Sequence, residues 1–245
     1  EEVHNIFKSL ENKTSYLSWE QIKNQVPAEW IKNLEINPTP LAAASLGQVH
    51  LMKYESKDYA MKIQYKGVGK AIKNDIKALK IFLKALNLVP SELDLNQIYQ
   101  EIELMLNKEI DYIEEVNNTV QFGNNLKDFP FFKVPHINQK FSNEKVISSE
   151  FLTGHSLHQI EEIGLTQEQR NLLGRQFLKL LFLELFVFKE IQTDAHFGNY
   201  IIITEPKLQW GLIDFGATKI PPTKFILGYR PVSYTHLRAH ETDSY

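Results

Sequence analysis

Residues 192–216 read QTDAHFGNYIIITEPKLQWGLIDFG and contain the polar side chains around which the rest of the chain is organised. Asp194 and Asn199 stand five positions apart, and Asp214 opens an Asp-Phe-Gly triplet. Between them, two apolar runs at 200–203 and 210–213 are joined by Thr-Glu-Pro-Lys, which predicts a β-hairpin. Such a hairpin brings its two acidic ends to one place, so the sequence predicts a single polar site here.

The order of these residues matches the catalytic segment of protein kinases, H-R-D-x-x-x-x-N followed by Asp-Phe-Gly. In kinases the first aspartate orients or deprotonates the attacking hydroxyl, and the asparagine and second aspartate hold Mg²⁺. Asp-Phe-Gly alone is a common turn, and only the complete order favours a catalytic interpretation. Carboxylate and amide oxygens are hard ligands that suit Mg²⁺. We therefore expect Asp194 to be catalytic and Asn199 and Asp214 to bind the metal.

Length and composition fit a soluble globular protein of one large domain or two lobes, with 245 residues, 43% hydrophobic and 23% charged. The net charge of -3 gives no support for nucleic-acid binding. The absence of cysteine excludes disulfides and thiolate zinc sites. The most apolar stretch, 172–188, contains Arg175, Lys179 and Glu184, which predicts a buried helix rather than a membrane span. The chain begins without Met or an apolar signal, and we expect it to be part of a longer protein.

A second hairpin is predicted upstream, from strands at 49–53 and 59–64 across the polar Glu-Ser-Lys-Asp at 55–58. The small residues at 42–47 precede it, where kinases have a glycine-rich phosphate loop. Alanine carries a Cβ, which holds the backbone further from a phosphate or changes its conformation. Lys62 stands on the second strand in Ala-Met-Lys, where the kinase pattern V-A-I-K has its phosphate-contacting lysine. A strand lysine is usually only solvated, but this position favours a nucleotide-binding role.

Helical patterns are expected at 1–36, 70–88, 93–122 and 165–188. The lysine face of 70–88 is expected to be solvated rather than bound to a membrane. A kinase lysine needs a helix glutamate to fix its side chain. Spacing alone does not choose among the acidic residues of 93–122, which are Glu101, Glu103, Glu109, Asp111 and Glu115. After a loop at 127–135 and a strand at 145–151, Thr153-Gly154 is typical of the hinge between two lobes.

Five blocks together resemble the UbiB/AarF-domain atypical kinase family, and within it the mitochondrial branch that supports coenzyme Q biosynthesis. They are PLAAASLGQV at 40–49, AMKIQY at 60–65, EIDY at 109–112, QTD at 192–194 and LIDFGAT at 212–218. The resemblance runs from about Leu10 to about Lys224. Many family members have prolines where this chain has Ala195 and Phe197, and the family's Lys-x-Gly-Gln motif is expected before Glu1.

The resemblance implies a nucleotide site built from the alanine-rich segment, which would bias nucleotide selection and restrain ordinary protein kinase activity. The residues implied for ATP or ADP are Ala42, Ala43, Ala44, Ser45 and Lys62. Lys62 would pair with Glu109 of the Glu-x-Asp motif, and Glu115 matches a further acidic position near the site. Lys62, Glu109 and Asp194 would be catalytic, with Mg²⁺ on Asn199 and Asp214.

The expected fold is α+β, a protein-kinase-like two-lobed fold truncated in the C-terminal lobe. The expected divisions are a partial N-terminal helical extension at 1–39, a kinase-like N-lobe at 40–152, a partial C-lobe at 153–230 and a non-native tail at 231–245. The tail, PVSYTHLRAHETDSY, shows neither helical nor strand periodicity and resembles translated adapter sequence.

The family implies an atypical kinase or ATPase that binds ATP or ADP with Mg²⁺ and supports coenzyme Q biosynthesis. The expected location is the mitochondrial inner membrane, peripherally, with coenzyme Q biosynthesis proteins and membrane lipids as partners and no nucleic acid. One alternative is a non-catalytic nucleotide-sensing scaffold for lipids or proteins. Another is a phosphotransferase of the choline-kinase kind, which shares the Asp, Asn, Asp order but lacks the block at 42–49.

Overall fold

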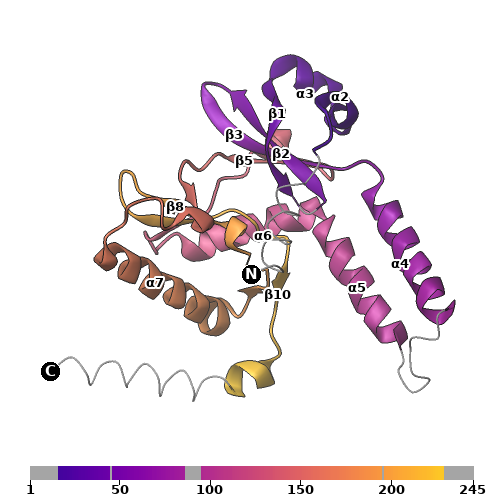
Figure 1. Ribbon diagram of the computed structural model, residues 1–245. Helices are drawn as coiled ribbons and strands as arrows, with labels where there is room; N and C mark the ends of the chain where they lie inside the picture. Colours follow the sequence, from indigo (N-terminus) through magenta and orange to yellow (C-terminus); the bar gives the residue numbers. More distant parts are fainter. Residues whose placement is uncertain (1–15, 45, 86–94, 195, 229–245) are drawn as a thin grey trace. The chain divides into compact units, whose positions relative to one another are not determined.

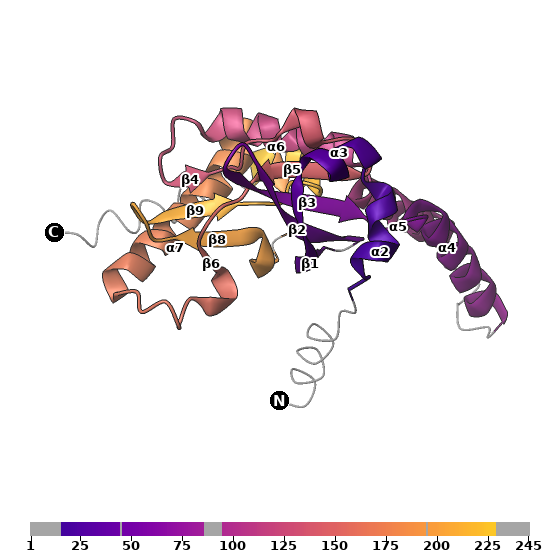
Figure 2. The same ribbon diagram turned by 90° about the horizontal axis from the view of Figure 1, so that it is seen from above.

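The computed structural model describes residues 16–44, 46–85, 95–194 and 196–228, which form helices and strands in mixed order (Figures 1 and 2). They divide into two compact units. The first takes the residues up to Val120 together with Pro135–Leu152, and the second takes Gln121–Val134 and the residues from Thr153 onward. The α+β class expected from the sequence is confirmed.

The first unit contains a four-stranded antiparallel sheet in the order β1-β2-β3-β5. The strands are β1 (Glu35–Ala44), β2 (Gly47–Tyr54), β3 (Lys57–Gln64) and β5 (Val146–Glu150). The expected β2–β3 hairpin is confirmed, and its turn residues Glu55 and Ser56 both have left-handed φ angles, 48° and 60°. Two consecutive positive φ values are typical of the tight turn whose twist matches paired strands.

Short helices at the start of the first unit complete its core. They are α2 (Trp19–Ile22), η1 (Lys23–Gln25) and α3 (Ala28–Asn33). Ile22 and Val26 join Met52, Met61 and Ile63 of the sheet in one buried apolar cluster. Burial of such side chains supplies the main favourable term in folding, about 1.5–3 kcal/mol for each large one.

The first strand corrects two expectations from the sequence. Residues 1–36 were expected to be helical, but β1 begins at Glu35, and residues 1–15 lie outside the described part. Ala42, Ala43 and Ala44 were expected to form a loop, but they continue β1 and pair with β2, with Ala44 opposite Gly47. The pairing satisfies backbone groups that a loop would leave to solvent, which is why small residues without strong β propensity remain in the strand.

Two long helices of the first unit, α4 (Val68–Ala85) and α5 (Leu95–Glu109), lie side by side (Figures 1 and 2). Ile72 and Ile76 of α4 and Tyr99 of α5 form their buried contact. The single helical pattern expected over 93–122 is wrong, because α5 ends at Glu109 and α6 (Tyr112–Leu126) begins three residues later. The Asp111 carboxylate accepts a hydrogen bond of 2.9 Å from the backbone N–H of Glu114, and such a cap starts a new helix.

The second unit contains a sheet in the order β4-β9-β8-β6 and a small β7–β10 pair. The strands are β4 (Phe132–Lys133), β6 (His155–Ser156), β7 (Ile191–Gln192), β8 (Tyr200–Ile203), β9 (Gln209–Leu212) and β10 (Thr218–Lys219). The antiparallel β8–β9 hairpin confirms the prediction made from residues 200–213. Three one-turn helices lie in the connections: η2 (Gln139–Phe141) between β4 and β5, η3 (Leu157–Gln159) between β6 and α7, and η5 (Phe197–Asn199) between β7 and β8.

Helix α7 (Gln167–Phe182) continues as a π-helical turn, η4 (Leu183–Phe188). One face of the helix packs against the four-stranded sheet of the second unit. Thr166 caps its start in a capping box with Gln169. The expected buried helix is buried on one face only, since Leu173 and Leu180 are buried whereas Leu178 is 56% and Val187 is 62% exposed. A helix that is apolar on several sides can bury only the face that meets the sheet. Across the part of the chain that the structure describes, no helix is long and apolar enough to cross a membrane.

The two units group the described residues differently from the expected divisions, since residues 16–39 fall in the first unit together with the strands that follow them. Residues 40–152 were expected to form one lobe, but Gln121–Val134 belongs to the second unit. Phe122 explains this, because it is fully buried there and its ring lies 4.7 Å from that of Phe215. The expected tail at 231–245 lies outside the described residues.

Candidate active site

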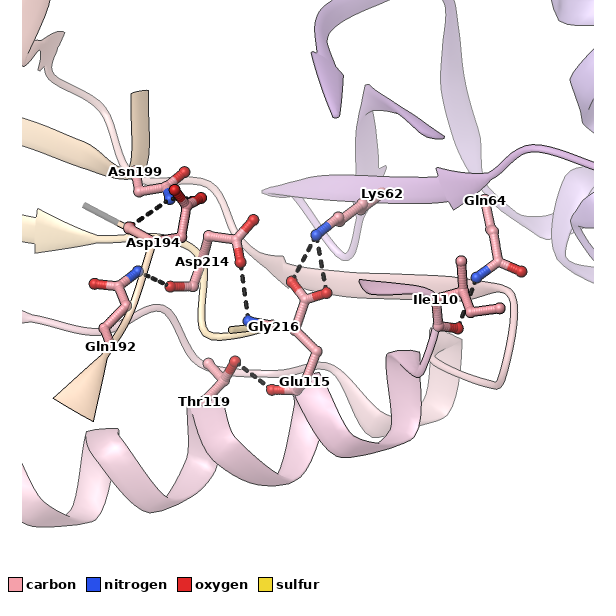
Figure 3. A network of polar contacts seen from close by, with 10 residues as sticks. All are labelled: Lys62, Gln64, Ile110, Glu115, Thr119, Gln192, Asp194, Asn199, Asp214 and Gly216. Atoms are coloured by element: carbon pink, nitrogen blue, oxygen red, sulfur yellow. Dashed lines mark hydrogen bonds and ion pairs between the residues drawn. The ribbon is translucent and has the colours of Figure 1, made fainter. Parts of the chain in front are cut away.

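The segment between β7 and β8 holds Asp194 and Asn199 against each other. The Asn199 amide donates to the Asp194 carboxylate at 2.8 Å and to the Asp194 carbonyl at 3.2 Å (Figure 3). The turn of η5 forms here because His196 accepts a hydrogen bond of 3.0 Å from the backbone N–H of Gly198. Asp194 is exposed and Asn199 is half-buried, so their oxygens remain accessible.

Asp214 follows β9 at the other end of the hairpin. Its carboxylate accepts a hydrogen bond of 2.9 Å from the backbone N–H of Gly216, and its carbonyl accepts one from the Gln192 side chain. The backbone N–H of Ile213 donates to the Asn199 carbonyl at 3.1 Å, which joins the two ends of the hairpin. The structure therefore brings Asp194, Asn199 and Asp214 together within the second unit, as the sequence predicts.

These three side chains offer carboxylate and amide oxygens, the donor set that Mg²⁺ prefers. Among the described residues, no group of three or more His, Cys, Asp or Glu side chains could hold a metal ion. That finding is compatible with Mg²⁺, which usually takes one or two protein carboxylates and completes its shell with water and substrate phosphates. The residues present therefore fit a magnesium-nucleotide complex.

Lys62 forms a buried ion pair in the first unit. Its ammonium nitrogen lies 2.8 Å from both carboxylate oxygens of Glu115, and the two side chains are 17% and 7% exposed (Figure 3). The same nitrogen lies 5.3 Å from the centre of the Tyr112 ring, a cation–π contact. Two opposite charges withdrawn from water hold each other firmly, so the position of the ammonium on β3 is well determined.

The partner of Lys62 corrects the expected pairing with Glu109. Glu109 is the last residue of α5, whereas Glu115 lies in the first turn of α6. Because Asp111 ends one helix and caps the next, the Glu-x-Asp motif forms the junction, and the helix after it presents the carboxylate to Lys62. The aspartate before a helical run was the signal that could have separated the two glutamates.

The glycine after the alanine-rich segment approaches the neighbouring strand closely. A Cβ on Gly47 would lie 2.4 Å from the Ile63 carbonyl oxygen and 2.9 Å from the Tyr112 hydroxyl. Of the residues expected to contact a nucleotide, Ala42 and Ala43 are exposed, Ala44 is half-buried, and Ser45 lies outside the described residues. Their contact with nucleotide remains a prediction.

Four polar side chains near the Asp194 segment were not singled out from the sequence as site residues. They are Glu184, Glu190, Gln192 and Tyr200. The Glu190 carboxylate accepts from the Gln121 amide, and the Tyr200 hydroxyl donates to the side-chain oxygen of Gln192 at 3.3 Å. Burial, together with the charges of Glu184 and Asp194, raises the pKa of Tyr200 to about 12. Glutamate inside an apolar stretch was the available signal for Glu184.

Glu184 is only 6% exposed, and burial raises the pKa of its carboxyl to about 7. Repulsion by Glu190 acts in the same direction, and a hydrogen bond from the backbone of Gln192 opposes it. A carboxyl whose folded-state pKa is raised contributes stability that is complete below its unfolded value and is lost as the pH rises through the folded value.

Glu184→Gln should therefore stabilise the protein in a pH-dependent way. The amide mimics the protonated acid and keeps an oxygen for the Gln192 N–H. We expect the variant to be more stable than the wild type by about 2 kcal/mol near pH 8 and to be equal to it near pH 4.5, since one pKa unit corresponds to about 1.4 kcal/mol and burial of the amide offsets part of the gain. Urea unfolding across this pH range measures the difference, with the exposed Glu168→Gln as control. A difference that does not change with pH would contradict the assignment.

An α+β fold in which a strand lysine pairs with a helix glutamate, and in which an Asp, Asn, Asp set surrounds a hairpin, is typical of the protein-kinase-like class. The sequence matches the ABC1 atypical kinase-like domain over residues 9–242, and the chain belongs to this family. The membership confirms the UbiB/AarF resemblance.

Similar proteins include mitochondrial and chloroplast kinases. The chain is 30% identical to the mitochondrial atypical kinase COQ8 of Saccharomyces cerevisiae, over 97% of this chain and 48% of that protein. It is 32% identical to the mitochondrial atypical kinase COQ8B of Danio rerio, over 91% of this chain and 36% of that protein. It is 30% identical to the chloroplastic protein ACTIVITY OF BC1 COMPLEX KINASE 8 of Arabidopsis thaliana, over 66% of this chain and 22% of that protein. The chain thus spans about half, or less, of these relatives.

A solved structure has the same fold. The chain resembles Rv3197 of Mycobacterium tuberculosis, solved in complex with erythromycin, with a TM-score of 0.72 and 29% identity over 89% of this chain and 56% of that one. At this level of similarity the arrangement of helices and strands is shared.

Proposed function

We propose that this protein binds ATP or ADP with Mg²⁺ and acts as an atypical kinase or ATPase. The observation that carries the proposal is the hydrogen-bonded set of Asp194, Asn199 and Asp214 at the two ends of one hairpin. The residue types and their order are those with which kinases hold Mg²⁺ and orient an attacking hydroxyl or water. Family membership supports the assignment.

Each residue has a chemical task in this proposal. Lys62, held by Glu115, contacts the nucleotide phosphates as a fixed positive charge. Asn199 and Asp214 hold Mg²⁺, and Asp194 accepts a hydrogen bond or the proton of the attacking hydroxyl. When bound, Mg²⁺ neutralises negative charge that develops on the transferred phosphoryl group. The exposed carboxylate of Asp194 is available to an acceptor from solvent.

The biological role that we propose is support of coenzyme Q biosynthesis at the mitochondrial inner membrane, with biosynthesis proteins and membrane lipids as partners. Several relatives carry the name COQ8 and the description mitochondrial, which supports this role. A chloroplastic relative means that the family serves more than one organelle. The alternative is a non-catalytic nucleotide-sensing scaffold, which would not require a catalytic carboxylate at Asp194.

Lys62→Ala should weaken binding of ATP and ADP by tenfold or more, because a hydrogen bond between charged groups contributes roughly 1.5–3 kcal/mol. Calorimetric titration of the intact protein with Mg²⁺-nucleotide measures the loss. Lys57→Ala, an exposed lysine on the same strand, is the matched control and should bind as the wild type does.

A second variant separates binding from stability. Lys62→Ala leaves Glu115 without the ammonium that compensates its buried charge, which by itself destabilises the fold. In Lys62→Ala/Glu115→Ala the carboxylate is removed too, so stability should recover while nucleotide affinity stays low. Recovery of affinity together with stability would show that Lys62 serves the fold and not the nucleotide.

A further inference from the structure

The side chain of Gln192 connects the segment that contains Asp194 with the segment that contains Asp214. It is the last residue of β7, two positions before Asp194, and its amide N–H donates to the backbone carbonyl of Asp214 (Figure 3). The Gln192 residue also pairs with Thr218 across the β7–β10 ladder, and Thr193 donates twice to the Ala217 carbonyl, at 2.8 Å and 2.9 Å. Asp214, which begins the Asp-Phe-Gly triplet, and Ala217, which follows it, therefore both accept hydrogen bonds from the segment that leads to Asp194.

The orientation of the Gln192 amide is determined by what it meets at each end. Its carbonyl oxygen accepts from the Tyr200 hydroxyl at 3.3 Å, and the Asp214 carbonyl at the other end can only accept. Turning the amide over would place its oxygen against the Asp214 carbonyl oxygen, whereas the Tyr200 hydroxyl can donate to an oxygen or accept from an NH₂ group. Tyr200 is only 5% exposed, and burial keeps its hydroxyl protonated well above neutral pH.

We propose that Gln192 is a positioning residue that fixes the backbone of Asp214 relative to Asp194, and that the Tyr200 hydroxyl supports it by donating to the amide oxygen. The proposal rests on the proposed function of the site as a magnesium-nucleotide site. Asp214 places a carboxylate that must meet a metal within a few tenths of an ångström, and a side chain that holds its peptide controls where that carboxylate lies. Gln192 itself binds neither metal nor nucleotide.

A glutamate at this position distinguishes a hydrogen-bonding role of Gln192 from a role in packing alone. Gln192→Glu has nearly the same shape, but its ionised carboxylate cannot donate to the Asp214 carbonyl, whereas its protonated form can. Gln192→Leu cannot donate at any pH. The charged groups near position 192 include Glu184, Glu190, Asp194 and Asp214, and all four are present in both variants. Differences in pH response between the variants therefore report the new carboxyl.

The affinity of the intact protein for Mg²⁺-ADP, measured from about pH 8 to pH 6, is expected to fall tenfold or more in both variants at the higher pH. As the pH falls, Gln192→Glu should regain affinity relative to the wild type at the same pH, while Gln192→Leu should not. Tyr200→Phe keeps the ring packed against Phe177 and Trp210 and should lose about threefold. Gln209→Leu, which removes a comparable amide bond to the Pro130 carbonyl, is the control and should bind normally.

Hydrogen exchange of the nucleotide-free protein supplies a readout that does not depend on nucleotide binding. Backbone amides at 215–217 should exchange faster in Gln192→Leu than in the wild type, and unchanged in Gln209→Leu. If the wild type itself shows no Mg²⁺-dependent binding, the proposed function fails and the exchange result alone decides the role of Gln192. Unchanged exchange at 215–217, or equal pH responses of the Glu and Leu variants, would overturn the proposal.

Discussion

Asp214→Asn is expected to remove the Mg²⁺-dependent stabilisation that ATP or ADP gives to the intact protein. The reason is a loss of charge with little change in shape. An asparagine oxygen can still accept from the Gly216 N–H, and the Gln192 amide bonds the backbone at this position and not the side chain. Mg²⁺, a hard cation, binds a neutral amide much more weakly than a carboxylate.

The expected size follows from mass action. A ligand at 100 times its dissociation constant stabilises the native state by about 2.7 kcal/mol, which shifts the melting temperature by several degrees. We expect the wild type to show this shift with Mg²⁺ and nucleotide together, and Asp214→Asn to lose most of it. Asp128→Asn, an exposed aspartate in the second unit, should keep the full shift.

The same variant separates the enzyme from the scaffold. If Asp214→Asn binds nucleotide but loses phosphoryl transfer or ATP hydrolysis and biological function together, chemistry is required. If it loses turnover and keeps biological function, the scaffold alternative is correct. A full Mg²⁺-dependent shift in Asp214→Asn would contradict the assignment of Asp214 as a metal ligand.

The sequence predicted the parts of the site that depend on local order. One hairpin separates Asp194 and Asn199 from Asp214. Alternating apolar residues with a proline turn are sufficient to predict that hairpin. The β2–β3 hairpin that presents Lys62 was equally local. In both hairpins the pairing of the strands positions the polar residues, so the spacing of these residues in the sequence is enough to predict where they lie on the hairpin.

The sequence did not predict contacts that depend on where one helix ends and another begins. Glu109 and Glu115 belong to one continuous helical pattern, and only the Asp111 cap separates them. Periodicity over 93–122 is nearly the same with or without the break, because each helix keeps its own apolar face. The partner of Lys62 could therefore be read only from the structure.

The tie between Gln192 and Asp214 was hidden for a related reason. Two residues 22 positions apart are joined by a side chain and a backbone carbonyl, and a carbonyl belongs to every residue and leaves no mark in a sequence. The sequence also did not predict how much of helix α7 is exposed to solvent. The apolar stretch at 172–188 predicts a buried helix, but the amount of structure that covers α7 decides which of its faces are buried.

Gly47→Ala is expected to destabilise the first unit by about 3 kcal/mol, the upper part of the range for overpacking a close contact. Gly47 opens β2, where its position is paired with both Ala44 and Gln64. A Cβ there would lie 2.4 Å from the Ile63 carbonyl oxygen, a backbone atom that cannot rotate away. The start of β2 must therefore move from β3, and the alanine-rich end of β1 moves with it.

A glycine in the opposite situation supplies the control. Gly174 lies inside α7, and nothing lies within 4 Å of the position that an added Cβ would take, so Gly174→Ala should stabilise by about 0.5–1 kcal/mol through helix propensity. Urea unfolding of the intact protein measures both changes. Equal changes in the free energy of unfolding for the two substitutions would show that a Cβ fits at position 47, which would contradict the prediction.

Nucleotide affinity of Gly47→Ala then tests whether the alanine-rich end of β1 matters for binding. Movement of this end should weaken ATP and ADP binding about tenfold if its backbone lies against the phosphates, since glycine and alanine positions there set how closely the chain approaches them. Binding is measured at a temperature where the variant is still folded, so that stability does not enter the comparison. Because the Lys62–Glu115 pair is made by β3 and α6, and not by β1 or β2, it should persist in this variant. A loss of affinity with that pair intact assigns the effect to residues 42–47, and unchanged affinity would remove Ala42, Ala43 and Ala44 from the nucleotide site.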